Sequence, residues 1–253
     1  EGNMMYQAFH LYKQSLQPLN SICKTISHLS THSNNPLKNN IINRHVGACA
    51  EIVGSVTRKY DKPVFGLKHT FINGKKVPVT KEVVVSKPFC DLLHFKRKGK
   101  YKHPKILMVA PMAGHYASLL RRTVEPFLPD HEVYVTDWKN ARDVPMEDGK
   151  FDFDDFVDYL VEFLQHLGPK NNLLAACQPC PGALAATAVL AMKNDPAQPK
   201  SLTLMAGPVN PQINAPSVLK LGDKIPLSFL KIMEIDKVPA SYAGKGRKVY
   251  PCF

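Results

Sequence analysis

The stretch Leu173-Leu174-Ala175-Ala176-Cys177-Gln178-Pro179-Cys180-Pro181-Gly182-Ala183 decides the fold of this 253-residue chain. Its first four residues form a short apolar run that ends at a thiol, and small residues suited to a helix follow at once. A strand buried on both faces of a sheet has this continuous apolar pattern, and the helix after it packs back on the sheet. The stretch therefore predicts a strand, a sharp turn and a helix, with Cys177 on the turn.

A cysteine on such a turn is raised clear of the sheet, at the N-terminal end of the next helix. This position lowers the pKa of a thiol and favours the nucleophilic thiolate. The backbone N–H of the following residue, Gln178, points toward the negative charge that develops on an attacked carbonyl oxygen. We predict that Cys177 is an acyl-transfer nucleophile and that the Gln178 N–H is one donor of its oxyanion hole.

Outward from this stretch, apolar strands alternate with amphipathic helices. The expected strands are 105–110, 132–136, 173–176 and 202–206, and the expected helices are 116–128, 152–167 and 181–193. Strands separated by helices of this length predict an α/β fold with a doubly wound, mostly parallel sheet. Ligands of such sheets bind beyond the carboxyl ends of the strands, where Met112, Asp137, Cys177 and Gly207 fall.

The loop after the strand 105–110 is the expected source of the second oxyanion donor, by the geometry of this fold. The candidates are the backbone N–H groups of Met112 and Ala113.

Upstream, the period of the hydrophobic pattern changes to two from Val64 onward, and Asn73-Gly74 predicts a type I′ turn between two antiparallel strands. Further short strands are expected at 82–86 and 89–96, at the edge of the larger sheet.

Three regions are expected: an N-terminal helical extension at 1–63, an α/β core at 64–210, and the start of a cap or insertion at 211–253. The extension holds helical patterns over 4–30 and 42–60, separated by a polar loop. These helices either cap the edge of a domain, which is the more common case, or bind an apolar surface outside the protein. After Gly207 the alternation lapses into a proline-rich segment with irregular apolar residues, which indicates an insertion over the sheet rather than another strand unit.

Composition narrows the classes of partner. Lys and Arg number 33 against 21 Asp and Glu, and this excess of positive charge favours anionic surfaces. No motif for reading nucleic acid is present, and the basic run 96–102 is interpreted as a solvated connection, so no nucleic-acid partner is expected. The sequence shows no signal peptide at its start and no apolar run of membrane-spanning length. Six widely spaced cysteines indicate free thiols in a reducing, cytoplasmic compartment.

Other interpretations of Cys177 remain open at this point. The motif departs from G-x-S-x-G because the nucleophile is Cys and because Ala175 and Pro179 replace the two glycines, so Cys177 can also be a small buried residue at a strand end. Cys177 and Cys180 form a C-x-P-C pair, as in thioredoxin-like redox proteins. Zinc is disfavoured, because one C-x-x-C supplies two ligands and no second pair follows. No cofactor or metal is expected.

Several motifs, in order along nearly the whole chain, carry a resemblance to a known family. They are Tyr6-Gln7, Tyr60-Asp61-Lys62-Pro63, Lys87-Pro88-Phe89-Cys90, Val109-Ala110-Pro111-Met112-Ala113-Gly114-His115, Val133-Tyr134-Val135-Thr136-Asp137-Trp138, Cys177-Gln178-Pro179, Ala206-Gly207-Pro208 and Gly246-Arg247-Lys248-Val249-Tyr250-Pro251. With them the chain resembles the intracellular polyhydroxyalkanoate (polyhydroxybutyrate) depolymerases, and Cys-Gln-Pro is the most specific of these motifs.

The resemblance implies an α/β-hydrolase fold, hydrolysis of carboxylic esters and a cysteine nucleophile, which Cys177 matches. It implies the polymer, or the surface of its storage granule, as the partner. The family does not have a cysteine at position 180, which makes the redox pair look accidental. A granule-binding module without turnover and a polyester synthase-like relative are the alternatives, although Cys-Gln-Pro argues against the synthase.

The family's catalytic Asp and His follow the nucleophile in the chain, as in other α/β-hydrolases. Here all ten histidines precede Cys177, and the last is His166. We therefore expect the chain to be the N-terminal part of a longer depolymerase, inactive by itself, with the C-terminal part of the fold missing. His115 is a candidate for a substitute base, but we interpret it as a cap of the following helix.

Overall fold

The computed structural model of the chain describes residues 4–57, 62–112, 116–207, 209–210, 213 and 224–251. The chain divides into two compact units, one up to Lys62 and one from Pro63 onward. Within the described residues, every helix is either too short or too polar to cross a lipid bilayer.

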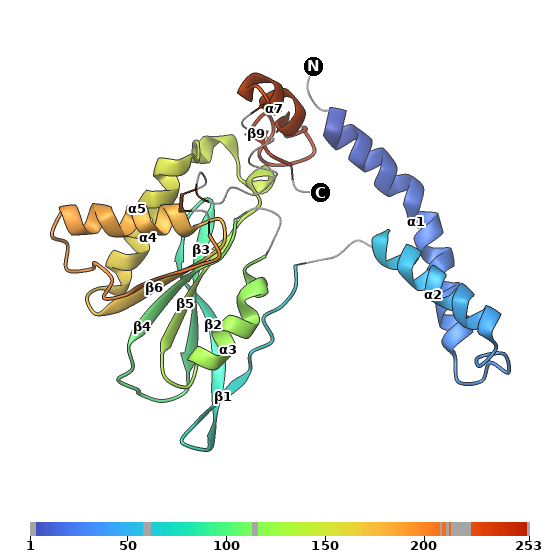
Figure 1. The fold of residues 1–253 in the computed structure, drawn as a ribbon, viewed down its shortest axis with the longest axis horizontal. Coiled ribbons are helices and arrows are strands. Elements are labelled where there is room, and N and C mark those ends of the chain that lie inside the picture. Colours follow the sequence, from blue (N-terminus) through green and yellow to red (C-terminus); the bar gives the residue numbers. More distant parts are fainter. Residues whose placement is uncertain are drawn as a thin grey trace. The chain divides into compact units, whose positions relative to one another are not determined.

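The first unit is a pair of antiparallel helices, drawn in blue in Figure 1. Helix α1 spans Met4–Thr31 with Pro18 inside it, and α2 spans Ile41–Val56. The side chain of Asn40 caps α2 by accepting the backbone N–H of Ile42, which satisfies one of the donors left unpaired at a helix start. The two predicted helices are confirmed, and α2 ends at Val56, before the predicted residue 60.

The second unit is built on a seven-stranded sheet. The strands are β1 (His69–Ile72), β2 (Lys75–Ser86), β3 (Cys90–Arg97), β4 (Lys105–Val109), β5 (Glu132–Trp138), β6 (Asn171–Ala176) and β7 (Leu202–Met205). Their order across the sheet is β1-β2-β3-β5-β4-β6-β7. The neighbours β5, β4, β6 and β7 are parallel, whereas β1, β2 and β3 pair antiparallel and form the edge next to β5.

The predicted hairpin is confirmed. Asn73 and Gly74 have φ angles of 50° and 75°, and Ile72 pairs with Lys75 across the two-residue turn. Both turn residues need positive φ in a type I′ turn, which Asn and Gly adopt most readily. After the turn β2 runs as one long strand, with a register shift between Val83 and Val85, rather than as the separate short strand predicted at 82–86.

Helices cover both faces of the parallel strands (Figure 1). Helix α4 (Phe153–Leu167) and α5 (Cys180–Met192) pack side by side on one face, and α3 (Arg121–Phe127), preceded by a 3₁₀ turn over Ala117–Leu120, lies on the other. Asp152 and Asp155 form a capping box at the start of α4, which explains why that helix begins where the sequence predicts. Leucines, valines and phenylalanines of these elements fill one core. The predicted α/β-hydrolase-like, doubly wound fold is confirmed.

The segment after the sheet has secondary structure of its own. The described residues 224–251 contain helix α7 (Leu227–Glu234) and two short paired strands, β8 (Asp236–Lys237) and β9 (Lys248–Val249), in a sheet separate from the seven-stranded one. Frequent prolines and irregular apolar spacing hid elements this short. Tertiary contacts hold them in place, because the guanidinium of Arg247 donates to the carbonyl oxygens of Pro145 and Gly149, at 2.7 Å each.

Candidate active site

Cys177 occupies a strained bend between β6 and α5. Its φ angle is +65°, a left-handed conformation that non-glycine residues rarely adopt and that clusters at functional sites. The Cys177 N–H still donates to the carbonyl oxygen of Met205 at 2.7 Å, so the residue stays attached to the sheet through β7. The N–H of Cys180 donates to the Cys177 carbonyl oxygen at 3.1 Å, which closes the turn into α5. The Cys177 side chain is exposed, as a nucleophile that meets a substrate must be.

The predicted oxyanion donors lie on both sides of this bend. Met112 follows β4, and its backbone N–H donates to the side-chain Oε1 of Gln178 at 3.2 Å. That amide oxygen therefore occupies the hydrogen-bonding position at Met112 that the prediction assigns to a substrate carbonyl oxygen. The structure thus brings Met112 and Gln178 together beside Cys177. Ala113 and His115 lie outside the described residues.

The loop that carries Met112 is fixed by two side chains of β5. The N–H of Ala110 donates to Thr136 Oγ1 at 2.9 Å, and the indole N–H of Trp138 donates to the Ala110 carbonyl oxygen at 2.9 Å. Thr136 and Trp138 are both buried. Because buried hydrogen bonds that are fully satisfied restrict local motion, the start of this loop is held rigidly against the sheet. Asp137, between them, is also buried.

A mainly apolar cavity of about 270 Å³ opens beside the bend. It is lined by Met112, Phe151, Asp152, Phe153, Phe156, Gln178, Pro179 and Gly182. Three aromatic rings near the start of α4 thus face the residues that surround the thiol. The carboxylate of Asp152 accepts the backbone N–H groups of Asp154 and Asp155, and its hydrogen bond with Lys150 lowers its pKa.

Two glycines permit the close packing around the bend. A Cβ at Gly182 would lie 2.3 Å from the ring of Phe156, and a Cβ at Gly207 would lie 2.2 Å from Cys180 Sγ and 2.6 Å from the Cys177 carbonyl oxygen. Such distances are far below van der Waals contact. Gly182 therefore lets the aromatic wall of the cavity reach α5, and Gly207 lets the end of β7 approach the bend.

The second thiol of the C-x-P-C pair has a different environment. Cys180 is fully buried, and its thiol lies 3.4 Å from the Ala175 carbonyl oxygen and 3.7 Å from that of Met205. Burial raises the pKa of the Cys180 thiol. A reactive thiol is partly exposed and has a lowered pKa, so Cys180 behaves as a structural residue. Among the described parts of the chain, no three His, Cys, Asp or Glu residues gather in an arrangement suited to a metal ion.

The sequence interpretation missed the aromatic lining of the cavity. In the predicted helix 152–167, Phe153 and Phe156 fall on one apolar stripe. Phe156 is buried, but Phe153, in the first turn, is 56% exposed. Spacing does not separate the two residues, and the signal for the cavity-facing position is a large aromatic residue immediately after the helix cap.

Comparison with known proteins gives structural similarity alone. No protein-family model and no curated protein sequence matches the chain. The chain is similar to the thioesterase domain from the curacin biosynthetic pathway (TM-score 0.40, 15% identity, covering 60% of this chain and 52% of that one). It is also similar to a membrane phospholipase A, a bacterial virulence factor (TM-score 0.39, 16% identity, covering 51% of this chain and 40% of that one). A third similar structure is a putative esterase from Staphylococcus aureus (TM-score 0.38, 14% identity, covering 75% of this chain and 62% of that one). The chain thus spans roughly half the length of these structures.

Proposed function

We propose that this chain carries the nucleophile and oxyanion site of a carboxylic ester hydrolase that acts on poly(3-hydroxyalkanoate). The observation that carries the proposal is the exposed Cys177 at φ +65°, between a buried strand and a helix, beside the Met112 N–H. A nucleophile elbow of α/β-hydrolases requires this strand–turn–helix context and one backbone donor from each of two loops. The polyester as substrate rests on the resemblance of the Cys-Gln-Pro and associated motifs to the depolymerases.

In the proposed reaction the Cys177 thiolate attacks the carbonyl carbon of an ester unit. The carbonyl oxygen takes the place of Gln178 Oε1 at the Met112 N–H and receives a second hydrogen bond from the Gln178 N–H. The bond to the ester oxygen then breaks, the hydroxyl end of the shortened polymer leaves with a proton, and a thioester remains on Cys177. Water hydrolyses the thioester, which releases the hydroxyacid and restores the thiol.

The aromatic cavity supports a small, uncharged acyl unit as the group that binds beside Cys177. Its volume of about 270 Å³ lies just under the ~300–1,000 Å³ typical of pockets for drug-sized ligands. Phe151, Phe153 and Phe156 favour an apolar group, and the carboxylate of Asp152 disfavours an anionic one. A hydroxyacyl unit within a neutral polyester meets both conditions, whereas a free carboxylic acid does not.

Single-turnover acylation tests the proposal without requiring a complete hydrolytic cycle. The chain is mixed with the p-nitrophenyl ester of a 3-hydroxyacyl dimer, and the released p-nitrophenol and the mass of the intact protein are measured. We expect one equivalent of p-nitrophenol and one added acyl group, mapped to Cys177 by peptide mass spectrometry. Cys177→Ala removes the attacking sulfur, so both signals are lost.

Cys49 provides the matched control because it is also a free, exposed cysteine, and it lies in the helical pair rather than in the sheet unit. Cys49→Ala should acylate at the wild-type rate. Equal loss of acylation in both variants, or an acyl group on Cys49 in the wild-type chain, would show non-selective thiol chemistry and contradict the proposal. Polymer specificity is tested separately, by comparing this ester with acyl groups that carry a terminal carboxylate, which we expect to react more slowly.

A further inference from the structure

The helical pair buries small and polar side chains between its helices. Its buried interface residues are Asn20, Cys23 and Ser30 on α1 and Gly47, Ala50 and Gly54 on α2. A Cβ at Gly47 would lie 2.9 Å from Ser30 Cβ, and the side chain of Asn20 donates to the Gly54 carbonyl oxygen and to Thr57 Oγ1. Small residues let helix backbones approach closely, but they bury little apolar area.

Eleven large aliphatic side chains of the two helices are exposed instead. They are Leu11, Leu19, Ile22, Ile26 and Leu29 on α1 and Ile41, Ile42, Val46, Ile52, Val53 and Val56 on α2. At 100° per residue, the five positions on α1 fall within a sector of about 80° and the six on α2 within about 140°. Each helix therefore carries an apolar stripe, interrupted by Ser15 on α1 and His45 on α2, that the pairing of α1 with α2 leaves uncovered.

Both stripes lie on the same side of the pair. Each stripe is rotated away from the interface residues of its own helix, by about 100° on α1 and about 140° on α2, and in the same rotational sense. The helices run antiparallel, since Asn20 meets Gly54 while Ser30 accepts a hydrogen bond from Asn43. Because one helix is reversed relative to the other, rotations in the same sense bring both stripes to the same side of the pair. The eleven residues named above thus form one surface, the apolar side of the hairpin.

The charge of this unit selects the kind of surface that fits it. Residues 4–57 contain Lys13, Lys24, Lys38 and Arg44 but a single acidic residue, Glu51. Lys24 lies about 170° from the centre of the stripe on α1, and Arg44 about 130° from the centre of the stripe on α2, so both are on the polar side of the pair. An amphipathic helix with basic residues on its polar face and a wide apolar face lies in the plane of an anionic lipid interface, with its apolar side chains at the level of the acyl chains.

We propose that the apolar side of the hairpin docks on an anionic phospholipid surface and attaches the chain to it. The helices lie in the plane of the interface. Isoleucine, leucine and valine side chains leave water, and the net positive charge of the pair is attracted to the anionic surface. This inference does not depend on the proposed ester chemistry, because Cys177 belongs to the other unit.

Flotation of the full chain with vesicles tests the proposal. The vesicles consist of phosphatidylcholine alone or of phosphatidylcholine with one quarter phosphatidylglycerol. We expect binding to the mixed vesicles that weakens as salt is raised and little binding to the neutral ones. The double variant Ile22→Gln/Ile52→Gln should bind the mixed vesicles at least ~10-fold more weakly, because each substitution places an amide on the apolar side.

Ser21→Gln/Ser55→Gln is the matched control, because it introduces the same side chain at exposed positions outside the apolar stripe of each helix. Its vesicle binding should stay within about twofold of wild type, and circular dichroism should show equal helix content in all three proteins. The proposal is overturned if both double variants bind equally, or if the wild-type chain ignores phosphatidylglycerol. It is also overturned if Ile22→Gln/Ile52→Gln instead converts a dimer into a monomer or lowers the melting temperature of the sheet unit.

Discussion

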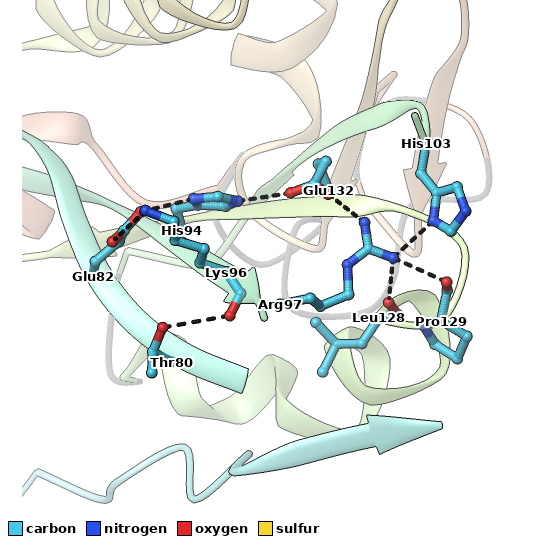
Figure 2. A network of polar contacts seen from close by, with 9 residues as sticks. All are labelled: Thr80, Glu82, His94, Lys96, Arg97, His103, Leu128, Pro129 and Glu132. Atoms are coloured by element: carbon cyan, nitrogen blue, oxygen red, sulfur yellow. Dashed lines mark hydrogen bonds and ion pairs between the residues drawn. The ribbon is translucent and has the colours of Figure 1, made fainter. Parts of the chain in front are cut away.

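The two ends of the parallel strands in the sheet unit carry different kinds of polar group. At the carboxyl ends of β4, β5 and β6, an exposed thiol sits in a strained backbone conformation beside a cavity. At the opposite end a chain of charged groups crosses three strands (Figure 2). His94 on β3 lies between Glu82 on β2 and Glu132 on β5, at 3.1 Å and 3.0 Å from their carboxylate oxygens.

Arg97 completes this network. Its side chain is fully buried, and it pairs with Glu132 while donating to the carbonyl oxygens of Leu128 and Pro129, each at 2.9 Å (Figure 2). Each ring nitrogen of His94 faces one carboxylate, so the imidazole bridges Glu82 and Glu132. The network links the antiparallel edge of the sheet to its parallel strands and to the end of α3.

With the proposed function, one sheet separates stability from function. Paired charges hold the strands together at one end, and the strained bend with its exposed thiol lies at the other. If this division holds, changes at the network end should alter the free energy of unfolding and leave acylation of Cys177 unchanged. Changes at the thiol end should alter acylation and leave the free energy of unfolding unchanged or higher.

The largest expected effect comes from Glu132→Gln. The substitution keeps the shape of the side chain but removes the negative charge between His94 and the buried Arg97. We expect the free energy of unfolding to fall by about 2 kcal/mol, less than for a fully buried pair because Glu132 is partly exposed. Urea unfolding measures this change. The acylation rate should be unaffected, and a parallel loss of acylation would break the proposed division between the two ends.

Acid should weaken the network end first. Hydrogen bonding to His94 is the main cause that lowers the pKa of Glu132 below its ordinary value of 4.5, and burial opposes it; the pKa of Glu82 is lowered in the same way. A carboxylate whose pKa is lowered by folding stabilises the protein above its unfolded pKa and loses that contribution as pH falls through the folded value. Below about pH 4.5 the free energy of unfolding should therefore drop more steeply in wild type than in Glu132→Gln. Parallel curves for the two proteins would contradict this expectation.

Cys177→Gly should produce a smaller effect of opposite sign at the thiol end. Glycine adopts a φ angle of +65° without the steric cost that a Cβ brings, so we expect a gain of about 1 kcal/mol in the free energy of unfolding. Acylation is lost at the same time. Cys177→Ala is the control, because it also lacks the sulfur but keeps the Cβ. Equal stabilities of the Gly and Ala variants would show that the bend stores no strain.

The smallest expected effect concerns Gln178. Replacing its side chain with alanine removes the amide oxygen that accepts the Met112 N–H, while the backbone N–H of residue 178 remains. A substrate carbonyl then competes with water rather than with a fixed acceptor, and we expect the acylation rate to rise about threefold. Gln178→Met, which keeps the length but not the oxygen, should behave alike. Slower acylation in both variants would assign Gln178 a positioning role instead.

Much of the fold follows from local patterns. The Asn73-Gly74 turn, the apolar run 173–176 and the acidic start of α4 each act through neighbouring residues, and the structure has them where the sequence predicts. The helix and strands at 227–249 have no such local signal, because they depend on a distant partner, the anchoring of Arg247 to the loop 145–149. The roles assigned to Cys177, Met112 and Gln178 stay predictions until acylation is measured.

The sequence by itself determined the alternation of strands and helices and the position of Cys177 on a turn, because hydrophobic periodicity and turn chemistry act over a few residues. Only the tertiary structure decided which thiol is accessible and which residues surround it. Cys177 and Cys180 are three positions apart, yet one is exposed and the other lies beneath the ends of β6 and β7. Burial depends on elements far apart in the chain, so no local pattern specifies it.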